Sequence, residues 1–386
     1  MTAVIPGNAV VLLENGQQYF PALEASINAA EREIFLQSYI FSGDAVGRSI
    51  AAALRRAARR GVAVRVMVDG FGGRDFVRDL MPSLADAGVE VLIYRREVRA
   101  LSLRRHRLRR LHRKVVVIDG REAYVGGINI TDDFEPEGLS FPRYDYAVRV
   151  EGPVLEAVVE SVHRLWRLVA WASFRRRVHQ PLLAPPRLTV AGSIRAAFVV
   201  RDNLRHRRAI EDAYLAAIET ARHEIVIANA YFFPGRRFRR ALIDAAERGV
   251  AVTLLLQGVG GDHPLQVYAT RALYPFLLQR GVRLFEYHRS HLHAKVAVVD
   301  GRWATVGSSN IDVFSLLLAR EANVVVEDEG FARRLGASLD AAMRDGAEEQ
   351  LPEAWRSLPL MRRMANWLAY QLVRMAIGIA GFGGKH

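Results

Sequence analysis

Cysteine is absent from the 386 residues of this chain. Without thiols, neither a disulfide framework nor thiolate ligation of a metal is available, and the composition suits a reducing cytoplasm. Uninterrupted apolar stretches of about 18 or more residues are also missing, which argues against a membrane-spanning helix. The amino terminus lacks a basic segment followed by an apolar core, so we expect no secretory signal. Any contact with a membrane is therefore expected to be peripheral.

Lysine is almost as scarce, and its scarcity makes each lysine informative. Among the 54 basic residues only three are lysines, namely Lys114, Lys295 and Lys385. A lysine is a compact point charge on a flexible stem, whereas an arginine is a wide planar fork. A site that must contact one phosphate oxygen beside a reacting atom favours the smaller group. The net charge of +13 predicts affinity for polyanions, either nucleic acid or an anionic membrane surface.

What the chain does contain is a pattern repeated around two of its lysines. The spacing H-x-K-x-x-x-x-D occurs at His112, Lys114 and Asp119 and again at His293, Lys295 and Asp300. We place each copy on a strand that begins at the histidine. Residues two apart on a strand share a face, so each histidine and its lysine point the same way. Each aspartate has the opposite parity, and we expect it to order the turn beyond the strand.

Further polar residues follow each copy at corresponding places. A glycine turn carries an asparagine, Asn129 in the first half and Asn310 in the second. An asparagine amide donates hydrogen bonds, and small neighbours let the backbone approach an oxygen closely. Asp145 and Glu321 then each begin an alternating strand. A carboxylate bound to one nitrogen of a histidine fixes its tautomer and supports the imidazolium that forms during a reaction.

These residue types in duplicate predict phosphoryl transfer. One imidazole can attack phosphorus while the other protonates the leaving oxygen and later deprotonates the acceptor. The two lysines and two asparagines can stabilise charge on the phosphate oxygens, a role that a metal would otherwise fill. We therefore predict a site that uses neither a metal nor a cofactor.

Helical and strand patterns also repeat between the halves. Ala53–Gly70 matches Ala241–Gly258, and each reads as a helix that ends at a glycine, followed by a strand rich in valine and leucine. Such alternation predicts an α/β fold. We expect one domain over residues 1–185, a second over 193–350 and a C-terminal segment over 351–386. The proline-containing stretch Gln180–Gly192 is the expected linker.

One mismatch separates the halves. Corresponding positions lie 193 residues apart at Gly88 and Gly281 but 181 apart at His112 and His293, so the first half has 12 extra residues before its motif. They fall within Arg95–Arg110, which holds eight arginines. Because the insertion leads directly into the motif, we expect an electrostatic collar for anionic headgroups at the mouth of the site.

The duplicated motif resembles the signature of the phospholipase D superfamily. That resemblance implies two similar domains, each a central mixed sheet flanked by helices, with the active site at their interface and no metal. It also implies that His112 is the nucleophile, which forms a covalent phosphohistidine, and that His293 is the general acid and base. The near symmetry of the halves leaves the reverse assignment open.

The likeness extends to bacterial cardiolipin synthases of the shorter, B type. It rests on segments such as Tyr144–Gly152, Ile227–Gly235 and Trp303–Asn310. It implies that two phosphatidylglycerol molecules are joined into cardiolipin with release of glycerol, at the cytoplasmic face of the inner membrane. Anionic phospholipid and a membrane surface are then the partners, and nucleic acid is not. The sequence carries no signal for an oligomeric state.

A C-terminal segment could reach the bilayer. Leu360–Phe382 predicts an amphipathic helix with Arg362, Arg363 and Arg374 on its polar half. Such a helix could lie in the membrane interface or pack against the protein core, and the sequence leaves both open.

Three other functions fit parts of the sequence. A lipid transferase could use phosphatidylethanolamine as donor or another alcohol as acceptor. A phosphodiesterase that cuts nucleic acid would suit the basic charge, but aromatic residues are not interleaved with the basic run as stacking platforms would require. An inactive membrane scaffold is disfavoured because both histidine–lysine pairs are retained.

Overall fold

The computed structural model describes residues 3–95, 110–134, 140–173, 189–202, 206–258, 264–312 and 319–377. Most of the arginine-rich insertion, residues 180–188 of the expected linker, and positions 378–382 of the expected C-terminal helix lie outside the described residues. The boundaries of the three expected domains stay a prediction.

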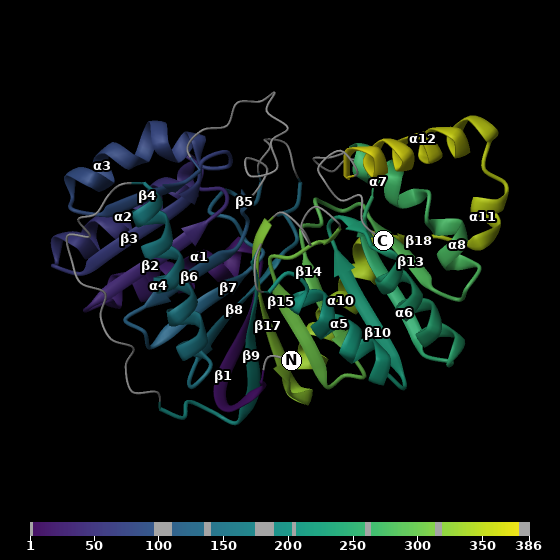
Figure 1. Ribbon diagram of the computed structural model, residues 1–386, viewed down its shortest axis with the longest axis horizontal. Coiled ribbons are helices and arrows are strands. Elements are labelled where there is room, and N and C mark those ends of the chain that lie inside the picture. The colour runs from purple at the N-terminus through teal and green to yellow at the C-terminus, as the bar shows by residue number, and fades with distance from the viewer. Residues whose placement is uncertain are drawn as a thin grey trace.

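The chain is built from two successive sets of elements (Figure 1). The first set comprises β1 (Ile5–Glu14), α1 (Asn15–Ala29), β2 (Glu33–Ser38), α2 (Ala45–Arg59), β3 (Ala63–Asp69), the π-helix Phe76–Leu80, α3 (Met81–Asp86), β4 (Glu90–Tyr94), β5 (Arg110–Leu111), β6 (Lys114–Ile118), β7 (Glu122–Gly126), β8 (Tyr146–Glu151) and α4 (Leu155–Ala172).

The second set repeats this plan and adds elements at its end. It comprises β9 (Ile194–Arg201), α5 (Ala209–Thr220), β10 (Glu224–Asn229), β11 (Phe232–Phe233), α6 (Arg236–Glu247), β12 (Ala251–Gln257), α7 (Pro264–Arg271), α8 (Tyr274–Leu278), β13 (Arg283–Tyr287), β14 (Lys295–Val299), β15 (Trp303–Gly307), β16 (Ile311–Asp312), β17 (Ala319–Glu327), α10 (Glu329–Gly346), β18 (Ala347–Glu349), α11 (Pro352–Arg356) and α12 (Leu360–Ile377).

Hydrogen bonds join the strands of both halves into one twisted system. Outward from the β1–β9 pair, the first half runs β8, β7, β6, β2, β3, β4, and the second half runs β17, β15, β14, β10, β12, β13 with β18 at its edge. In each half three parallel strands follow a run of antiparallel ones, so each sheet is mixed. The predicted α/β class with two similar halves is confirmed.

Local sequence explains these elements. Strands β6 and β14 read Lys-Val-Val-Val-Ile and Lys-Val-Ala-Val-Val and are buried throughout, as expected for β-branched strands covered on both faces. Helices α2 and α6 are each followed by a glycine with positive φ, Gly61 at 92° and Gly249 at 89°. That left-handed conformation ends a helix at little cost only where no Cβ is present.

The cores tie the halves together. One apolar cluster contains Val115 and Val117 from β6, Val296 and Val298 from β14, and the inward side of α4 and α10. Two further clusters lie under α1 to α3 in the first half and under α5, α6 and α8 in the second. Because a single core crosses the junction, the two motifs are held at a defined separation.

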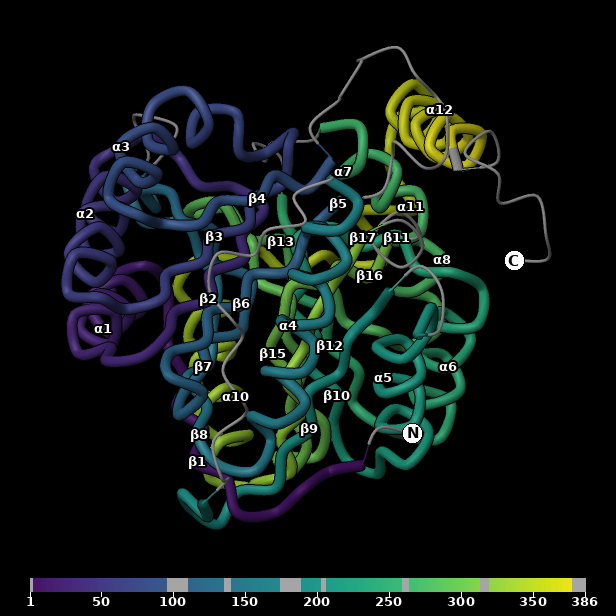
Figure 2. The backbone as a smooth tube through the Cα atoms, turned by 60° about the vertical axis from the view of Figure 1, so that its left-hand side comes forward, coloured from purple at the N-terminus to yellow at the C-terminus, as the bar shows by residue number. Residues whose placement is uncertain are grey.

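Strand direction determines where the motifs meet. In each half the strand that carries the motif runs antiparallel to its parallel neighbours, β6 to β2 and β14 to β10. The histidine before each motif strand therefore lies at the edge where the parallel strands end. We call this the site edge; in the second half α7 and α12 also lie there (Figures 1 and 2). Among the described helices, none is long and apolar enough to cross a membrane.

Candidate active site

The backbone of His112 is held by the opposite half. Strand β5 pairs in parallel with β17, and the N–H groups of His112 and Arg113 donate to the carbonyl of Arg320 at 3.0 and 2.8 Å. This contact corrects our expectation that the motif strand begins at the histidine. Strand β6 begins at Lys114, because the two preceding residues bond across the junction instead of within their own sheet.

His293 is held in the same way from the first half. Its N–H donates to the carbonyl of Tyr144 at 2.8 Å, and the N–H of Tyr144 donates to the carbonyl of His291 at 2.8 Å. Arg320 and Tyr144 each stand directly before an orienting carboxylate. The two contacts are thus reciprocal, and each half fixes the approach to the other half's motif.

The carboxylates cross the junction as well. The Nδ1 atom of His112 lies 3.0 and 3.1 Å from the two carboxylate oxygens of Glu321, and Nδ1 of His293 lies 2.6 Å from Asp145. A carboxylate at Nδ1 places the proton there and leaves Nε2 with its lone pair directed into the site. Both carboxylates were predicted to orient a histidine. That each serves the histidine of the other half was not visible in the sequence.

Both motif lysines are buried beside their histidines. The Nζ atom of Lys114 donates to the carbonyl of His112 at 2.8 Å, and Nζ of Lys295 donates to the carbonyl of His293. Burial is the main cause that lowers the pKa of Lys114 to about 7 and that of Lys295 to about 8. Each ammonium is therefore poorly solvated, and an arriving phosphate would restore the missing contacts.

Electrostatic coupling unites the two motifs in one site. Burial lowers the pKa of His112, and the charges of Lys114 and Lys295 lower it further, against the opposing effect of Glu321. Burial, followed by Lys295, lowers the pKa of His293 well below its ordinary value, with contributions from Lys114 and His112 of the other half. Burial also raises the pKa of Asp145 to about 7. Both imidazoles are thus neutral near neutral pH.

The asparagines follow the strands beside the motif strands. Asn129 and Asn310 are buried after β7 and β15, and the side-chain oxygen of Asn129 accepts from the N–H of Ile40 at 3.3 Å. We expected the glycine beside Asn129 to let the backbone approach an oxygen of the substrate, but Gly127 has a different role. A Cβ on Gly127 would collide with the carboxylate of Asp145, so the glycine makes room for the group that orients His293.

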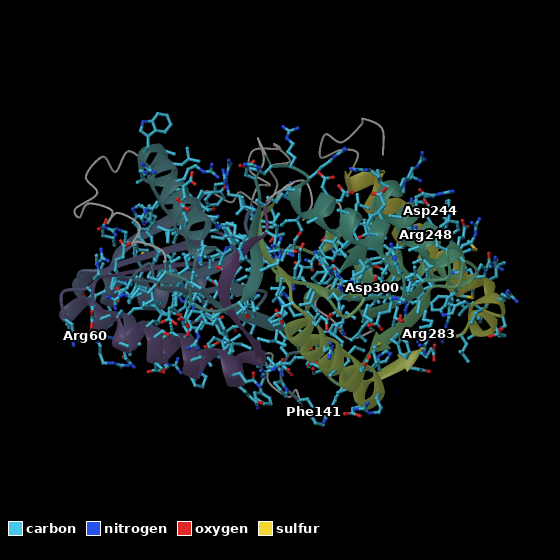
Figure 3. All side chains as sticks on the ribbon, turned by 90° about the horizontal axis from the view of Figure 1, so that it is seen from below. Arg60, Phe141, Asp244, Arg248, Arg283 and Asp300 are labelled. Atoms are coloured by element: carbon cyan, nitrogen blue, oxygen red, sulfur yellow. The ribbon has the colours of Figure 1, made fainter. Side chains whose placement is uncertain are left out.

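Asp119 and Asp300 lie at the opposite end of their strands from the histidines (Asp300 in Figure 3). Asp119 accepts from the N–H groups of Glu31, Arg32 and Glu33 at 2.8–2.9 Å. Asp300 accepts from three N–H groups of residues 222–224 over the same range. The two aspartates have positive φ, 52° and 51°. These hydrogen bonds order the turns, as the strand parity indicated. Among the residues that the structure describes, neither aspartate forms a hydrogen bond with a motif histidine.

Several positioning residues escaped the sequence analysis. Asp69 accepts from the N–H of Leu111 at 2.8 Å, and Gln257 accepts from the N–H of Leu292. These residues end the corresponding strands β3 and β12, before the glycines Gly70 and Gly258, and their shared position was the available signal. The ring of Tyr39 lies 4.9 Å from that of His112.

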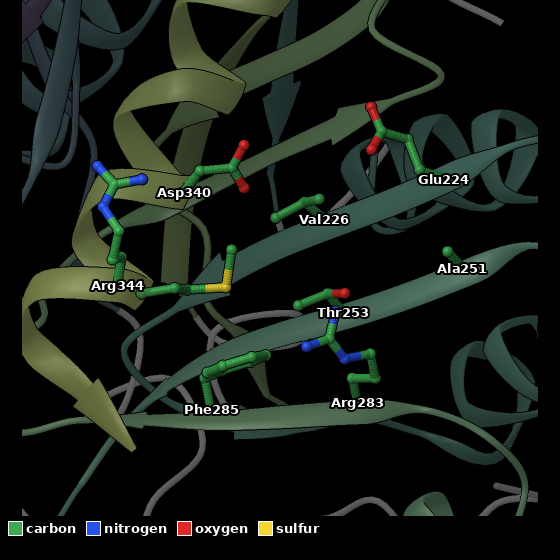
Figure 4. Close-up of a pocket in the computed structure, with 9 residues that line it drawn as sticks. Glu224, Val226, Ala251, Thr253, Arg283, Phe285, Asp340 and Arg344 are labelled. Atoms are coloured by element: carbon green, nitrogen blue, oxygen red, sulfur yellow. The ribbon is translucent and has the colours of Figure 1, made fainter. Parts of the chain in front are cut away.

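Two surface hollows lie apart from this centre. One, of 360 Å³, lies against α10 and contains both signs of charge, including Glu224, Asp340, Arg283 and Arg344 (Figure 4). The other, of 760 Å³, lies between α6, α8 and α12. Neither includes a motif residue. Within the described part of the chain, no group of three histidine, aspartate or glutamate side chains could hold a metal ion.

Comparison with known proteins agrees with this geometry. A family model described as "Cardiolipin synthase, PLD-like domain" matches residues 23–135 and 214–343. Cardiolipin synthase B of Escherichia coli strain K12 is 41% identical over 98% of this chain and 91% of its own length. Cardiolipin synthase B of Salmonella typhi is 43% identical over the same shares. A crystal structure of phosphatidylserine synthase from Haemophilus influenzae superposes with a TM-score of 0.72 at 11% identity, over 97% of this chain and 95% of that one, which shows a common fold.

Proposed function

This chain belongs to the cardiolipin synthases with phospholipase D-like domains, and we propose that it joins two phosphatidylglycerol molecules into cardiolipin and releases glycerol. The observation that carries the proposal is the reciprocal pairing of His112 with Glu321 and of His293 with Asp145. Two oriented imidazoles beside two buried lysines supply every group that a phosphatidyl transfer needs.

In the first step Nε2 of His112 attacks the phosphorus of one phosphatidylglycerol. A nitrogen–phosphorus bond forms as the bond from phosphorus to the glycerol oxygen breaks. His293 is neutral before substrate binds, but the pKa of its partner Asp145 is raised to about 7, so below that pH the pair holds one additional proton. With the negatively charged phosphate bound, His293 takes up this proton as the imidazolium and donates it to that oxygen, and free glycerol leaves. Glu321 stabilises the positive charge that develops on His112, since it holds the proton on Nδ1.

In the second step a glycerol hydroxyl of another phosphatidylglycerol attacks the phosphohistidine. The neutral His293 takes the hydroxyl proton, the new oxygen–phosphorus bond forms, and His112 leaves as a neutral imidazole. The charges return to their starting state, so no external acid or base is consumed. Water at this step would give phosphatidic acid instead, which makes exclusion of water part of the function.

Lys114 and Lys295 would stabilise charge on the non-bridging phosphate oxygens, together with Asn129 and Asn310. Each lysine donates to the carbonyl of its own histidine, which holds the ammonium beside that histidine. Asp119 and Asp300 would support the motif strands through their turns and take no part in proton transfer.

We place the enzyme at the cytoplasmic face of the cell membrane as a peripheral protein. The net charge of +13 favours anionic lipid surfaces. The absence of cysteine suits a reducing compartment.

The test is to incubate purified enzyme with labelled phosphatidylglycerol in vesicles, with a chelator present. Cardiolipin and glycerol in equal amounts are the expected products. His112→Ala and His293→Ala should each lower the rate by about 10⁴-fold or more. Phosphatidic acid alone would recast the protein as a hydrolase, and oligonucleotide cleavage without lipid turnover would make it a nuclease. Cardiolipin formed only with phosphatidylethanolamine present would change the donor.

A further inference from the structure

Helix α12 buries only a narrow face. Ala369 and Val373 pack against Ala269 of α7 and against Phe233. The rest of the helix exposes large apolar side chains: Met361, Met364, Trp367, Leu368, Leu372 and Met375. Trp367 is 57% exposed and Met361 is 84% exposed. We call these six side chains the α12 face. An apolar set of this size marks an interaction surface, because side chains of this kind otherwise occur singly on a soluble surface.

A basic pocket adjoins the α12 face. The 760 Å³ hollow between α6, α8 and α12 is lined by Arg236, Arg239, Arg240 and Arg280, together with Trp367 and Tyr370. We call it the arginine pocket. Trp367 belongs to both features, so the apolar surface and the basic surface are continuous.

The charge of the pocket is incompletely neutralised. Among the residues that the structure describes, no acidic side chain lines it. Arg240 pairs with Asp244 at 2.8 Å and Arg280 with Glu247 at 2.9 Å, both on the exposed surface. Arg236 and Arg239 have no carboxylate partner among the described residues. Guanidinium groups form forked hydrogen bonds that match the oxygens of a phosphate.

Both features lie at the site edge. Helix α12 packs on α7, which follows β12 in the chain. The last residue of β12 is Gln257, which accepts from the N–H of Leu292, the residue before His293. Helix α7 itself exposes Leu265 and Tyr268, 49% and 40% accessible. The first half places Phe71, 45% exposed, after its corresponding strand β3. Apolar side chains therefore stand on the side from which a lipid would reach the histidines.

We propose that the arginine pocket binds the headgroup phosphate of an anionic phospholipid outside the catalytic centre, while the α12 face enters the boundary between headgroups and acyl chains. Apolar residues beside arginines, with Trp367 and Tyr370 between them, match that boundary. Nucleic acid would satisfy the arginines and leave the apolar face in water. The inference deepens the proposed function and rests on it for the identity of the lipid.

The test measures binding to vesicles with the full chain. Arg236→Ala combined with Arg239→Ala should weaken partitioning onto vesicles of phosphatidylglycerol and phosphatidylcholine by about 30-fold, from the usual contribution of a basic residue near an anionic surface. Arg302→Ala combined with Arg334→Ala is the matched control. It removes the same charge from the turn after Asp300 and from α10, and neither arginine has a carboxylate partner within the described ranges. This variant should change binding little. Equal weakening in the two double variants would mean that binding depends on the net charge of the protein and not on the arginine pocket, and it would overturn the proposal.

Two further measurements separate this inference from the proposed function. Transfer between short-chain phosphatidylglycerol molecules dissolved as monomers should proceed at the wild-type rate in the double variant of α6. Trp367→Ala should weaken vesicle binding and leave that soluble reaction unchanged. Failure of the wild-type enzyme to form cardiolipin from the soluble substrate would sink the proposed function alone. Unchanged vesicle binding in both the double variant and Trp367→Ala would sink the docking surface alone.

Discussion

The two motif lysines are set apart from the arginines by what burial does to them. An arginine stays charged in almost any environment, whereas a lysine loses its proton when it is removed from water. Lys114 and Lys295 are fully enclosed, and their charge is therefore conditional on pH. The scarcity of lysine in the sequence was enough to single both out. Their perturbed pKa values depend on packing between the halves, which no local pattern contains.

We expect the activity to fall as pH rises through the pKa values of these lysines. The pKa of Lys114 is lowered to about 7 and that of Lys295 to about 8, so the ammonium groups are present below those values and are lost above them. The decline of kcat/KM, measured on a soluble short-chain substrate, should begin near neutral pH and be advanced by pH 9. On the acid side, kcat/KM should fall only below the ordinary histidine pKa, because burial lowers the pKa of His112. A basic limb near pH 10 would contradict this.

At the scale of the element, the motif strands and the turns beyond them were predictable. Alternation placed each histidine and lysine on one face, and parity assigned Asp119 and Asp300 to turns, where their carboxylates accept three backbone N–H groups each. The predicted starts of β6 and β14 were each wrong by two residues, because both strands begin at the lysine and not at the histidine. A strand is extended by pairing with its neighbour, and the residues before Lys114 pair with a strand that is distant in sequence.

Asp119→Ala is expected to destabilise the protein and to affect catalysis only through the fold. It removes hydrogen bonds to a charged acceptor and places a Cβ residue without a local hydrogen bond at φ 52°, for a cost of about 3 kcal/mol. Asp119→Asn, which tolerates that φ and keeps one oxygen, should cost less. Denaturant unfolding measures both. A large rate loss with an unchanged unfolding midpoint would instead give Asp119 a part in the chemistry.

For the whole molecule, the sequence predicted two similar halves, and the structure confirms them. It could not predict how the halves exchange side chains. Both carboxylates were predicted to begin a strand, but Glu321 is the third residue of β17 and Asp145 directly precedes β8. From the sequence, each could have served the histidine of its own half. Only the arrangement of the halves shows that Glu321 bonds to His112 and that Asp145 bonds to His293. That arrangement follows from the core that α4 and α10 share with both motif strands.

The exchange predicts paired kinetic effects. Glu321→Gln should lower the rate of His112 attack, and Asp145→Asn should lower proton transfer by His293, each by about 10²- to 10⁴-fold in cardiolipin formation. A phosphatidyl ester of p-nitrophenol separates them, since its leaving group needs no proton. Asp145→Asn should still release a burst of p-nitrophenol, and Glu321→Gln should not. The opposite pattern would exchange the roles of the two histidines.

The crossed carboxylates also bear on how such a protein could arise. A polypeptide with a single copy of the repeat would have no carboxylate beside its histidine. A second copy would have to associate with it and supply that carboxylate. Duplication followed by fusion would place both histidines and both carboxylates in one chain. In a joined chain the two halves can change independently of each other, and the first half is 12 residues longer than the second before its motif.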